Sequence, residues 1–143
     1  MQCGERSAIL GCVALEAPSF EGFLFRTHLV TYMLPLTLEI RYWIDGKGTN
    51  PFQDWFDGLD STAKTKVTVA LKRLEKGNTS NVAHLSGGIS ELKIDFGPGY
   101  RIYFGQDGPR LVILVAGGTK KRQQRDIDAS KERWQRYLAS RTR

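Results

Sequence analysis

Apolar and polar positions between residues 36 and 59 predict a strand followed by a short helix. Residues 36–43 alternate apolar and polar side chains, which is the pattern of a half-buried strand. Asn50 and Pro51 indicate a helix start, because Asn caps free backbone N–H groups and Pro at the first helical position loses no needed donor. The apolar residues that follow have helical spacing, and they are Phe52, Trp55, Phe56 and Leu59.

A second helix is predicted from residue 60 or 61, where Asp60 or Ser61 provides the N-terminal cap. Its apolar face consists of Ala63, Val67, Ala70, Leu71 and Leu74. We expect Gly77 to end this helix, since glycine readily adopts the left-handed conformation that follows a helix C-terminus. The tight turn between the two helices predicts an antiparallel helical hairpin with a shared apolar side.

The pattern changes to strands in the second half of the chain. Polar side chains separate Leu92, Ile94 and Phe96, and likewise Ile102 and Phe104, with a turn predicted at residues 97–99 between the two strands. A second turn is predicted at residues 105–109. Residues 111–116 are apolar without alternation, as in a central strand that is covered on both faces, and we expect Gly117 and Gly118 to end it.

The last predicted element is a helix from about residue 123. Ile127, Trp134 and Leu138 fall on one side of it, and basic residues occupy the remainder. The complete order, β-α-α-β-β-β-α, predicts an α+β domain in which an antiparallel meander is preceded by a helical hairpin and followed by a basic helix.

Composition adds a strong charge asymmetry to this picture. The chain has 143 residues, enough for one domain, and a net charge of +6. Residues 119–143 contain nine Lys or Arg and three Asp or Glu, so this segment accounts for the whole net charge. Such a segment is either a solvated helix face or an electrostatic footprint for nucleic acid or an acidic partner. No apolar run approaches the roughly 18 residues of a membrane span.

The first 32 residues differ from the rest of the chain. They hold both cysteines, Cys3 and Cys12, and residues 17–32 show neither a helical nor a strand period. We hypothesise that Met33 is the biological start, that residues 1–32 are a disordered tail or a wrongly assigned extension, and that residues 33–143 form the domain. A body without thiols fits a reducing compartment, and we expect a cytoplasmic protein.

The sequence offers few of the side chains that common enzyme classes use. It has two histidines, no cysteine after residue 12, no phosphate-binding loop and no metal-binding spacing of carboxylates. We therefore expect no metal, no cofactor and no hydrolase site of the common kinds.

What remains is a set of polar residues that strand alternation places on one face of the sheet. The set consists of Glu91, Lys93, Asp95, Arg101 and Tyr103, with Lys120, Lys121 and Arg122 following the next strand. One interpretation is a solvated sheet face on which the two acidic groups pair with Lys93 and Arg101. The other is a functional site. Alternation also predicts that Arg101 points away from the core, so that its removal opens no cavity.

The motifs Glu-Leu-Lys-Ile, Gly-Tyr-Arg-Ile-Tyr-Phe and Gly-Gly-Thr-Lys-Lys, at residues 91–94, 99–104 and 117–121, resemble the RelE/ParE toxin superfamily. The similarity is greatest to the HigB-like "addiction module killer protein" branch and covers residues 36–138. It implies the toxin of a type II toxin–antitoxin system with a RelE-like fold. Its partner would be a cognate antitoxin from the adjacent gene, of helix-turn-helix type, and no membrane partner is expected.

The resemblance also implies a site and two activities. RelE and HigB members are mRNA interferases, endoribonucleases that cleave ribosome-bound mRNA and arrest translation, whereas ParE members inhibit DNA gyrase. The motif match assigns the RNase role to Arg101, Lys93, and Lys120 or Lys121, and Tyr103 belongs to the same motif as Arg101. The chemistry of these residues leaves the base open between Lys93 or Lys120 and the carboxylates Glu91 or Asp95. RelE itself uses a tyrosine early in the closing helix, where this chain has Ile127 or Asp128.

Three hypotheses therefore remain open from the sequence. The first is a metal-independent endoribonuclease, in which fixed cations stabilise the charge that builds on a scissile phosphate. The second is a gyrase inhibitor without catalytic residues, and the third is a non-enzymatic RNA- or protein-binding module. The cluster of Lys93, Arg101 and Lys120 favours the first, because a gyrase inhibitor has no need for converging phosphate ligands.

Overall fold

The structure, a computed structural model, describes residues 37–142. The hypotheses about residues 1–32 and about a start at Met33 concern a segment outside the described residues, and they stay predictions. Within residues 37–142 the predicted α+β fold class is confirmed, with a single five-stranded sheet and three α-helices.

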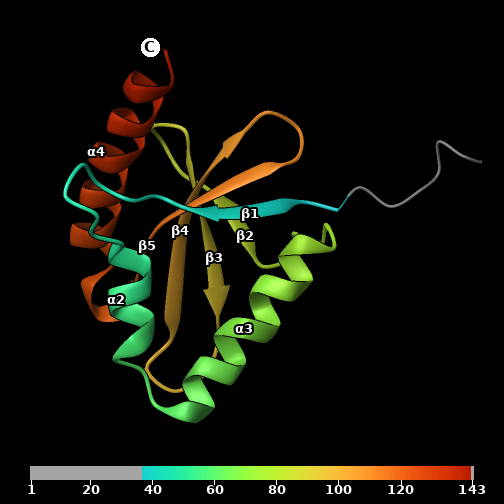
Figure 1. Cartoon of the computed structure of the whole chain (residues 1–143). Coiled ribbons are helices and arrows are strands. Elements are labelled where there is room, and N and C mark those ends of the chain that lie inside the picture. Colours follow the sequence, from blue (N-terminus) through green and yellow to red (C-terminus); the bar gives the residue numbers. More distant parts are fainter. Residues whose placement is uncertain (1–36, 143) are drawn as a thin grey trace, which may run out of the picture. The chain divides into compact units, whose positions relative to one another are not determined.

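The sheet has the strand order β1-β5-β4-β3-β2 (Figure 1). Its strands are β1 (Glu39–Tyr42), β2 (Val82–His84), β3 (Ile89–Ile94), β4 (Tyr100–Asp107) and β5 (Leu111–Thr119). The strands from β2 to β5 pair antiparallel, which confirms the meander, and β1 joins β5 in parallel. Strand β2 is absent from the predicted order because its three residues are too few to show a period.

The helices begin where the local sequence predicts, although α2 ends before Leu59, the last residue of its predicted apolar face. Their bounds are α2 (Pro51–Asp57), α3 (Ser61–Glu75) and α4 (Gln123–Arg141), and a short 3-10 helix, η1 (Lys120–Arg122), leads into α4. The Asn50 side chain accepts from the backbone N–H of Gln53 at 3.1 Å, and the Asp60 side chain accepts from that of Ala63 at 2.9 Å. Gly77 adopts a φ of 84° just after α3, so the expected glycine stop is confirmed.

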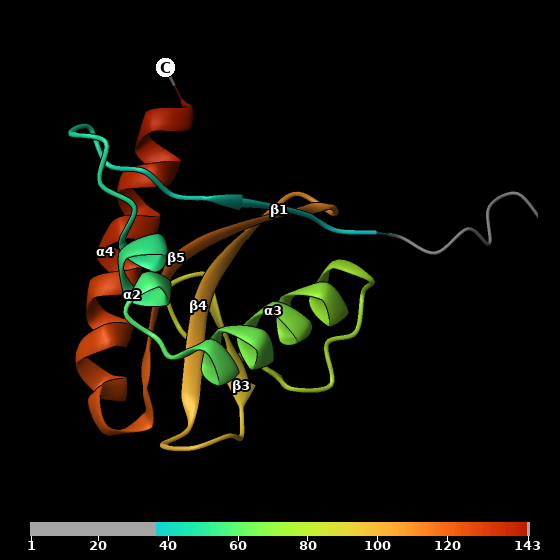
Figure 2. The ribbon, with the colours of Figure 1, turned by 60° about the horizontal axis from the view of Figure 1, so that its bottom comes forward.

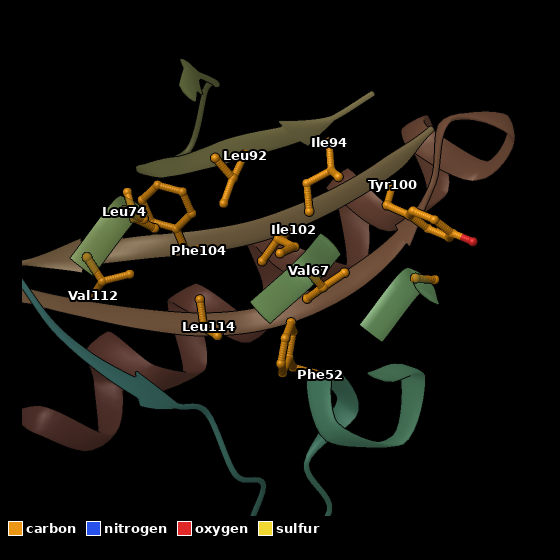
Figure 3. Close-up of a cluster of buried hydrophobic side chains, with 11 residues drawn as sticks. Phe52, Val67, Leu74, Leu92, Ile94, Tyr100, Ile102, Phe104, Val112 and Leu114 are labelled. Carbon is orange, nitrogen blue, oxygen red and sulfur yellow. The ribbon is translucent and has the colours of Figure 1, made fainter. Parts of the chain in front are cut away.

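Both faces of the sheet are covered, and each has its own apolar core. On one face α2 and α3 pack on β3, β4 and β5, as the side chains in Figure 3 show. This core consists of Phe52, Ala63, Val67, Leu74, Leu92, Ile94, Tyr100, Ile102, Phe104, Val112 and Leu114. On the other face α4 places Ile127 and Trp134 over residues of β3, β4 and β5. Strand β5 contributes to both cores, so the prediction of a doubly covered central strand is confirmed.

Two predicted strand ends are wrong, and tryptophan packing explains both. Strand β4 continues through Gly105, and β5 continues through Gly117 and Gly118. A Cβ at Gly105 would lie 2.3 Å from the Trp134 ring, and a Cβ at Gly117 would lie 2.0 Å from the Trp55 ring. These glycines therefore stay in the strands and let a large ring lie directly on the backbone, from α4 on one face and from α2 on the other.

Replacing Gly117 by Ala should destabilise the fold, because the added methyl group would overlap the Trp55 ring. We expect a loss of roughly 1–3 kcal/mol in the free energy of unfolding, as for other overpacked cores. Gly46→Ala is the matched control, since no atom lies within 4 Å of the added Cβ there. Denaturant titration of both variants measures the difference, and equal stabilities would show that Trp55 does not need the glycine.

Candidate functional site

The candidate residues gather at one end of the sheet, in a buried group and an exposed group. The buried group is Glu91, Arg101 and Tyr103, whose relative exposures are 1%, 6% and 0%. The exposed group is Lys93, Lys120 and Lys121. We call the three exposed lysines the lysine rim.

Strand register brings the two groups together. Arg101 lies opposite Lys93 of β3 on one side and opposite Gly118 of β5 on the other. The backbone N–H of Lys120 donates to the Gly99 carbonyl at 2.9 Å, which ties η1 to the turn between β3 and β4. A Cβ on Gly99 would lie 3.5 Å from the Lys120 Cβ and 3.8 Å from the Arg101 Nη1. The side of Arg101 that faces this turn therefore has Lys120 as a near neighbour.

A carboxylate holds the Arg101 guanidinium inside the protein. Its Nε lies 3.1 Å from the Glu91 Oε1, and these two side chains are only 8% and 2% exposed. The N–H direction is unfavourable for a hydrogen bond, so the contact is an ion pair rather than a directed bond. The Glu91 Oε1 accepts a hydrogen bond from the Gln123 Nε2 at 2.8 Å, which links the pair to the first turn of α4.

The other end of the guanidinium faces the protein surface. Its Nη1 donates to the Tyr100 carbonyl at 3.0 Å and lies 3.9 Å from the Asp95 Oδ1. The Asp95 side chain is 87% exposed, so this second ion pair is open to water. Screening by water makes it much weaker than the pair with Glu91.

The expectation that Arg101 points away from the core is wrong. Strand alternation does separate Arg101 from Ile102, but α4 covers the face that Arg101 occupies, and the same holds for Tyr103. The solvated-face interpretation is correct in pairing Arg101 with Glu91 and Asp95, although the main pair is buried. Lys93, which that interpretation also paired, makes no ion pair with any residue between 37 and 142.

Sequence reasoning missed two residues of this cluster, Gln123 and Asp126 of α4. A Cβ at Gly118 would lie 2.0 Å from the Asp126 Oδ2, so the glycine admits this carboxylate against β5. The Asp126 Oδ2 and the Tyr103 Oη are both buried without a hydrogen-bond partner among the described residues. The sequence feature that could have revealed them is the Gly117-Gly118 pair, which we interpreted as a strand end. In the structure the pair lets the Trp55 ring and the Asp126 carboxylate approach the strand from opposite faces.

Burial controls the protonation of this cluster. It raises the pKa of Tyr103 well above its usual range, the charges of Glu91 and Asp126 raise it further, and Arg101 opposes them. Tyr103 therefore stays protonated at neutral pH and can donate a hydrogen bond but cannot act as a base. Burial also raises the pKa of Asp126, against the lowering effect of Arg122, Arg125 and Arg133.

The resemblance implies a tyrosine at the position of Ile127 or Asp128, and neither of these side chains can do the chemistry of a phenol. Ile127 packs into the core between α4 and the sheet. Asp128 is exposed, and its Oδ1 accepts from the Gln124 Nε2 at 3.1 Å. The first turns of α4 therefore offer Gln123 and Asp126 to the cluster instead of an aromatic hydroxyl.

The described residues contain neither a membrane-spanning helix nor a cluster of metal-ligating side chains. None of the helices between residues 37 and 142 is sufficiently long and apolar to cross a bilayer. Across the same residues, no three His, Cys, Asp or Glu side chains are grouped so that they could hold a metal ion.

The chain belongs to the family of phage-derived Gp49-like proteins (DUF891), whose model matches residues 54–135. This family is toxin-like and of the addiction-module kind. The matched segment contains all six candidate residues, so the cluster and the lysine rim lie within the family domain.

One relative extends this comparison. An uncharacterized protein of Haemophilus influenzae is 41% identical over 86 residues, which cover 59% of this chain and 87% of the relative.

Removing the Arg101 side chain should destabilise the protein, because Glu91 would be left as a buried charge. We expect Arg101→Ala to cost about 3–5 kcal/mol of unfolding free energy, as for other broken buried pairs. Lys93→Ala, on the neighbouring strand, is the exposed control and should change it by less than about 0.5 kcal/mol. Replacing the pair together, as Glu91→Leu/Arg101→Met, should cost less than Arg101→Ala alone. Equal stabilities of the two single variants would show that the pair is not structurally important.

Asp126 should make stability depend on pH. Its pKa in the folded protein is raised, so the folded state binds this proton more tightly than the unfolded state does. The ionised carboxylate therefore lowers stability above the folded-state pKa and has no such effect below the unfolded value. Asp126→Asn should stabilise the protein at neutral pH. This gain should vanish as the pH falls through the folded-state pKa of Asp126 toward the unfolded value. Thermal unfolding from pH 3 to pH 8 measures it, with the exposed Asp128→Asn as control; a gain independent of pH would contradict the assignment.

Proposed function

We propose that this protein is the toxin of a type II toxin–antitoxin system and that it acts as a ribosome-dependent, metal-independent mRNA endonuclease. Its membership of a toxin-like, addiction-module family supports the first part. The observation that carries the second part is that exposed Lys93 lies opposite Arg101 across the strand pair and exposed Lys120 begins at the Gly99 turn that the Arg101 guanidinium faces. Such a group of cations matches the charge of a phosphodiester and of the transition state for its cleavage.

In the proposed reaction, the 2′-hydroxyl of one nucleotide attacks the adjacent phosphorus. A 2′-O–P bond forms, the bond from phosphorus to the 5′-oxygen breaks, and the products are a 2′,3′-cyclic phosphate and a 5′-hydroxyl. The lysine rim neutralises the charge on the phosphorane oxygens, and Arg101 adds a fixed charge beneath them. Since Glu91 is engaged with Arg101 and Gln123, its role in this scheme is to position the guanidinium.

Proton transfer in this scheme falls to exposed groups. Asp95 is 87% exposed and adjoins Arg101, so it is the carboxylate that can take the proton of the 2′-hydroxyl. A rim ammonium returns a proton to the leaving 5′-oxygen, and the donor is Lys120 or Lys121. Tyr103, fully buried and protonated, does not reach the substrate and supports the cluster from below.

The partner of this toxin is proposed to be a cognate antitoxin from the adjacent gene, of helix-turn-helix type. An acidic segment of the antitoxin would cover the lysine rim, because the positive charge of this chain is concentrated there and in α4. Ribosome-bound mRNA is the proposed substrate, and cytoplasm the proposed compartment.

A second candidate function, inhibition of DNA gyrase, is favoured by one observation. The Arg101 side chain is only 8% exposed and paired with Glu91, so it presents little free guanidinium to a phosphate. A toxin that binds a protein target needs no such group. The two candidates predict different damage inside the cell, cleaved mRNA for the endonuclease and gyrase-linked DNA breaks for the gyrase inhibitor.

Induction of the full chain should stop growth, and translated mRNAs should acquire new 5′-hydroxyl ends within codons. Replacing Lys93, Lys120 and Lys121 together by Ala should abolish these ends, since losing one donor that stabilises a transition state typically costs about 10²–10³ in rate. The three side chains are exposed, so the melting temperature should stay unchanged.

The control for this triple variant removes the same charge elsewhere on the described domain, with Lys47→Ala, Lys64→Ala and Lys72→Ala. Mapping of 5′ ends and growth on induction are the measurements. Intact mRNA with accumulating gyrase-linked DNA breaks would select the second candidate. A full chain that leaves growth unaffected would contradict the assignment as a toxin.

A further inference from the structure

A basic groove lies between α3 and β3, outside the buried cluster. Figure 2 shows α3 in front of β3, and the groove, of about 360 Å³, follows their contact. Its volume falls at the lower end of the range of about 300–1,000 Å³ that is usual for small-molecule sites. Its lining includes Lys66, Val69, Arg73, Lys93, Asp95 and Phe96.

The side chains of this groove combine positive charge with an aromatic surface. Lys66, Arg73 and Lys93 are exposed, and none of them forms an ion pair with a residue of the described chain. Asp95 is the one acidic residue in the lining. The Lys66 Nζ lies over the Phe96 ring, 5.4 Å from its centre, in a cation–π contact.

The groove is continuous with the candidate site. Lys93 belongs to both, as a member of the lysine rim and of the groove lining. Asp95 also lines the groove, and its Oδ1 lies 3.9 Å from the Arg101 Nη1. The rim and the groove lie on opposite faces of the sheet, and Lys93 and Asp95 connect them, so a strand whose phosphate lies at the lysine rim can enter the groove by passing around the end of β3.

The opposite side of α3 has a different chemical character. A groove of about 250 Å³ there is lined by apolar and aromatic side chains, among them Tyr42, Phe52 and Phe56. Lys72, its one basic lining residue, pairs with Glu75 at 2.8 Å. Among the residues that line these two grooves, positive charge without an ion-pair partner is found only on the β3 side.

We propose that the groove between α3 and β3 binds single-stranded RNA, as a subsite for the nucleotides next to the scissile phosphate. Lys66 and Arg73 contact phosphates, while Phe96 and the 43% exposed Val69 contact a base or sugar. Single-stranded nucleic acid is bound in this way elsewhere, by a positive groove that follows the backbone and by rings on which bases stack. The inference rests on the proposed function.

The test uses the full chain and a fluorescent 2′-O-methyl RNA of about ten nucleotides, a length within the usual range of single-strand binding sites. The methyl group removes the attacking hydroxyl, so binding is measured without cleavage. Lys66→Ala/Arg73→Ala should weaken binding and lower the slope of log affinity against log salt by about 1.4, for two lost phosphate contacts at about 0.7 each. Lys64→Ala/Lys72→Ala removes the same charge from the other side of α3 and should change neither.

Phe96→Leu tests the aromatic contact separately. Leucine keeps the apolar packing of this half-buried residue against the core and removes the ring. We expect affinity for the RNA to fall about fivefold or more, since a stacked base contributes about 1 kcal/mol or more. The salt slope should stay unchanged, because no charge is lost.

A rim variant, Lys120→Ala/Lys121→Ala, separates failure of this inference from failure of the proposed function. Weaker binding by the rim variant with normal binding by the groove variants would overturn the subsite and leave the proposed function standing. RNA binding that neither set of changes affects, or no binding of the free RNA at all, would overturn the subsite, whereas the proposed function, which is ribosome-dependent, is decided separately by the mapping of mRNA 5′ ends. Groove variants that bind RNA normally but lose affinity for the antitoxin would show that the groove receives an acidic protein segment instead.

Discussion

The ion pair between Arg101 and Glu91 determines how the end of the sheet is built. Two charges that have left water are tolerated only when they face each other and their remaining polar atoms have partners. Glu91 meets this requirement through Arg101 and Gln123, which come from β4 and from the first turn of α4. The pair therefore links β3, β4 and α4 at the point where the lysine rim begins.

The structure separates the cations of this region into two physical states. Arg101 is fixed, because its position is set by a buried carboxylate and by the Tyr100 carbonyl. The lysines of the rim are exposed and keep the rotamer freedom of long side chains. The fixed Arg101 charge gives an anion a defined position, and the lysine side chains above it can adjust to that anion. The two kinds of residue also respond differently to substitution. Arg101 changes affect stability first, whereas lysine changes leave the fold intact.

Glycines give the sheet its unusual tolerance of large neighbours. Gly105 and Gly117 each accept a tryptophan ring, and Gly118 accepts the Asp126 carboxylate. A sheet of ordinary side chains keeps helices farther away, because the side chains on its faces stand between helix and backbone. Here the close approach of α4 buries the polar cluster, and burial is what raises the pKa values of Tyr103 and Asp126.

The sequence by itself determined the elements and their order apart from β2, since helix caps at Asn50 and Asp60 and alternation in β3 and β4 are local properties. It also brought Glu91, Lys93, Arg101 and Tyr103 to one face. Only the tertiary structure decided which of them meet water, because α4, distant in sequence, covers three of the four and leaves Lys93 exposed. The roles of Gly105, Gly117 and Gly118 were decided in the same way. A glycine looks the same in the sequence whether it ends a strand or admits a ring, and the difference lies in what packs against it.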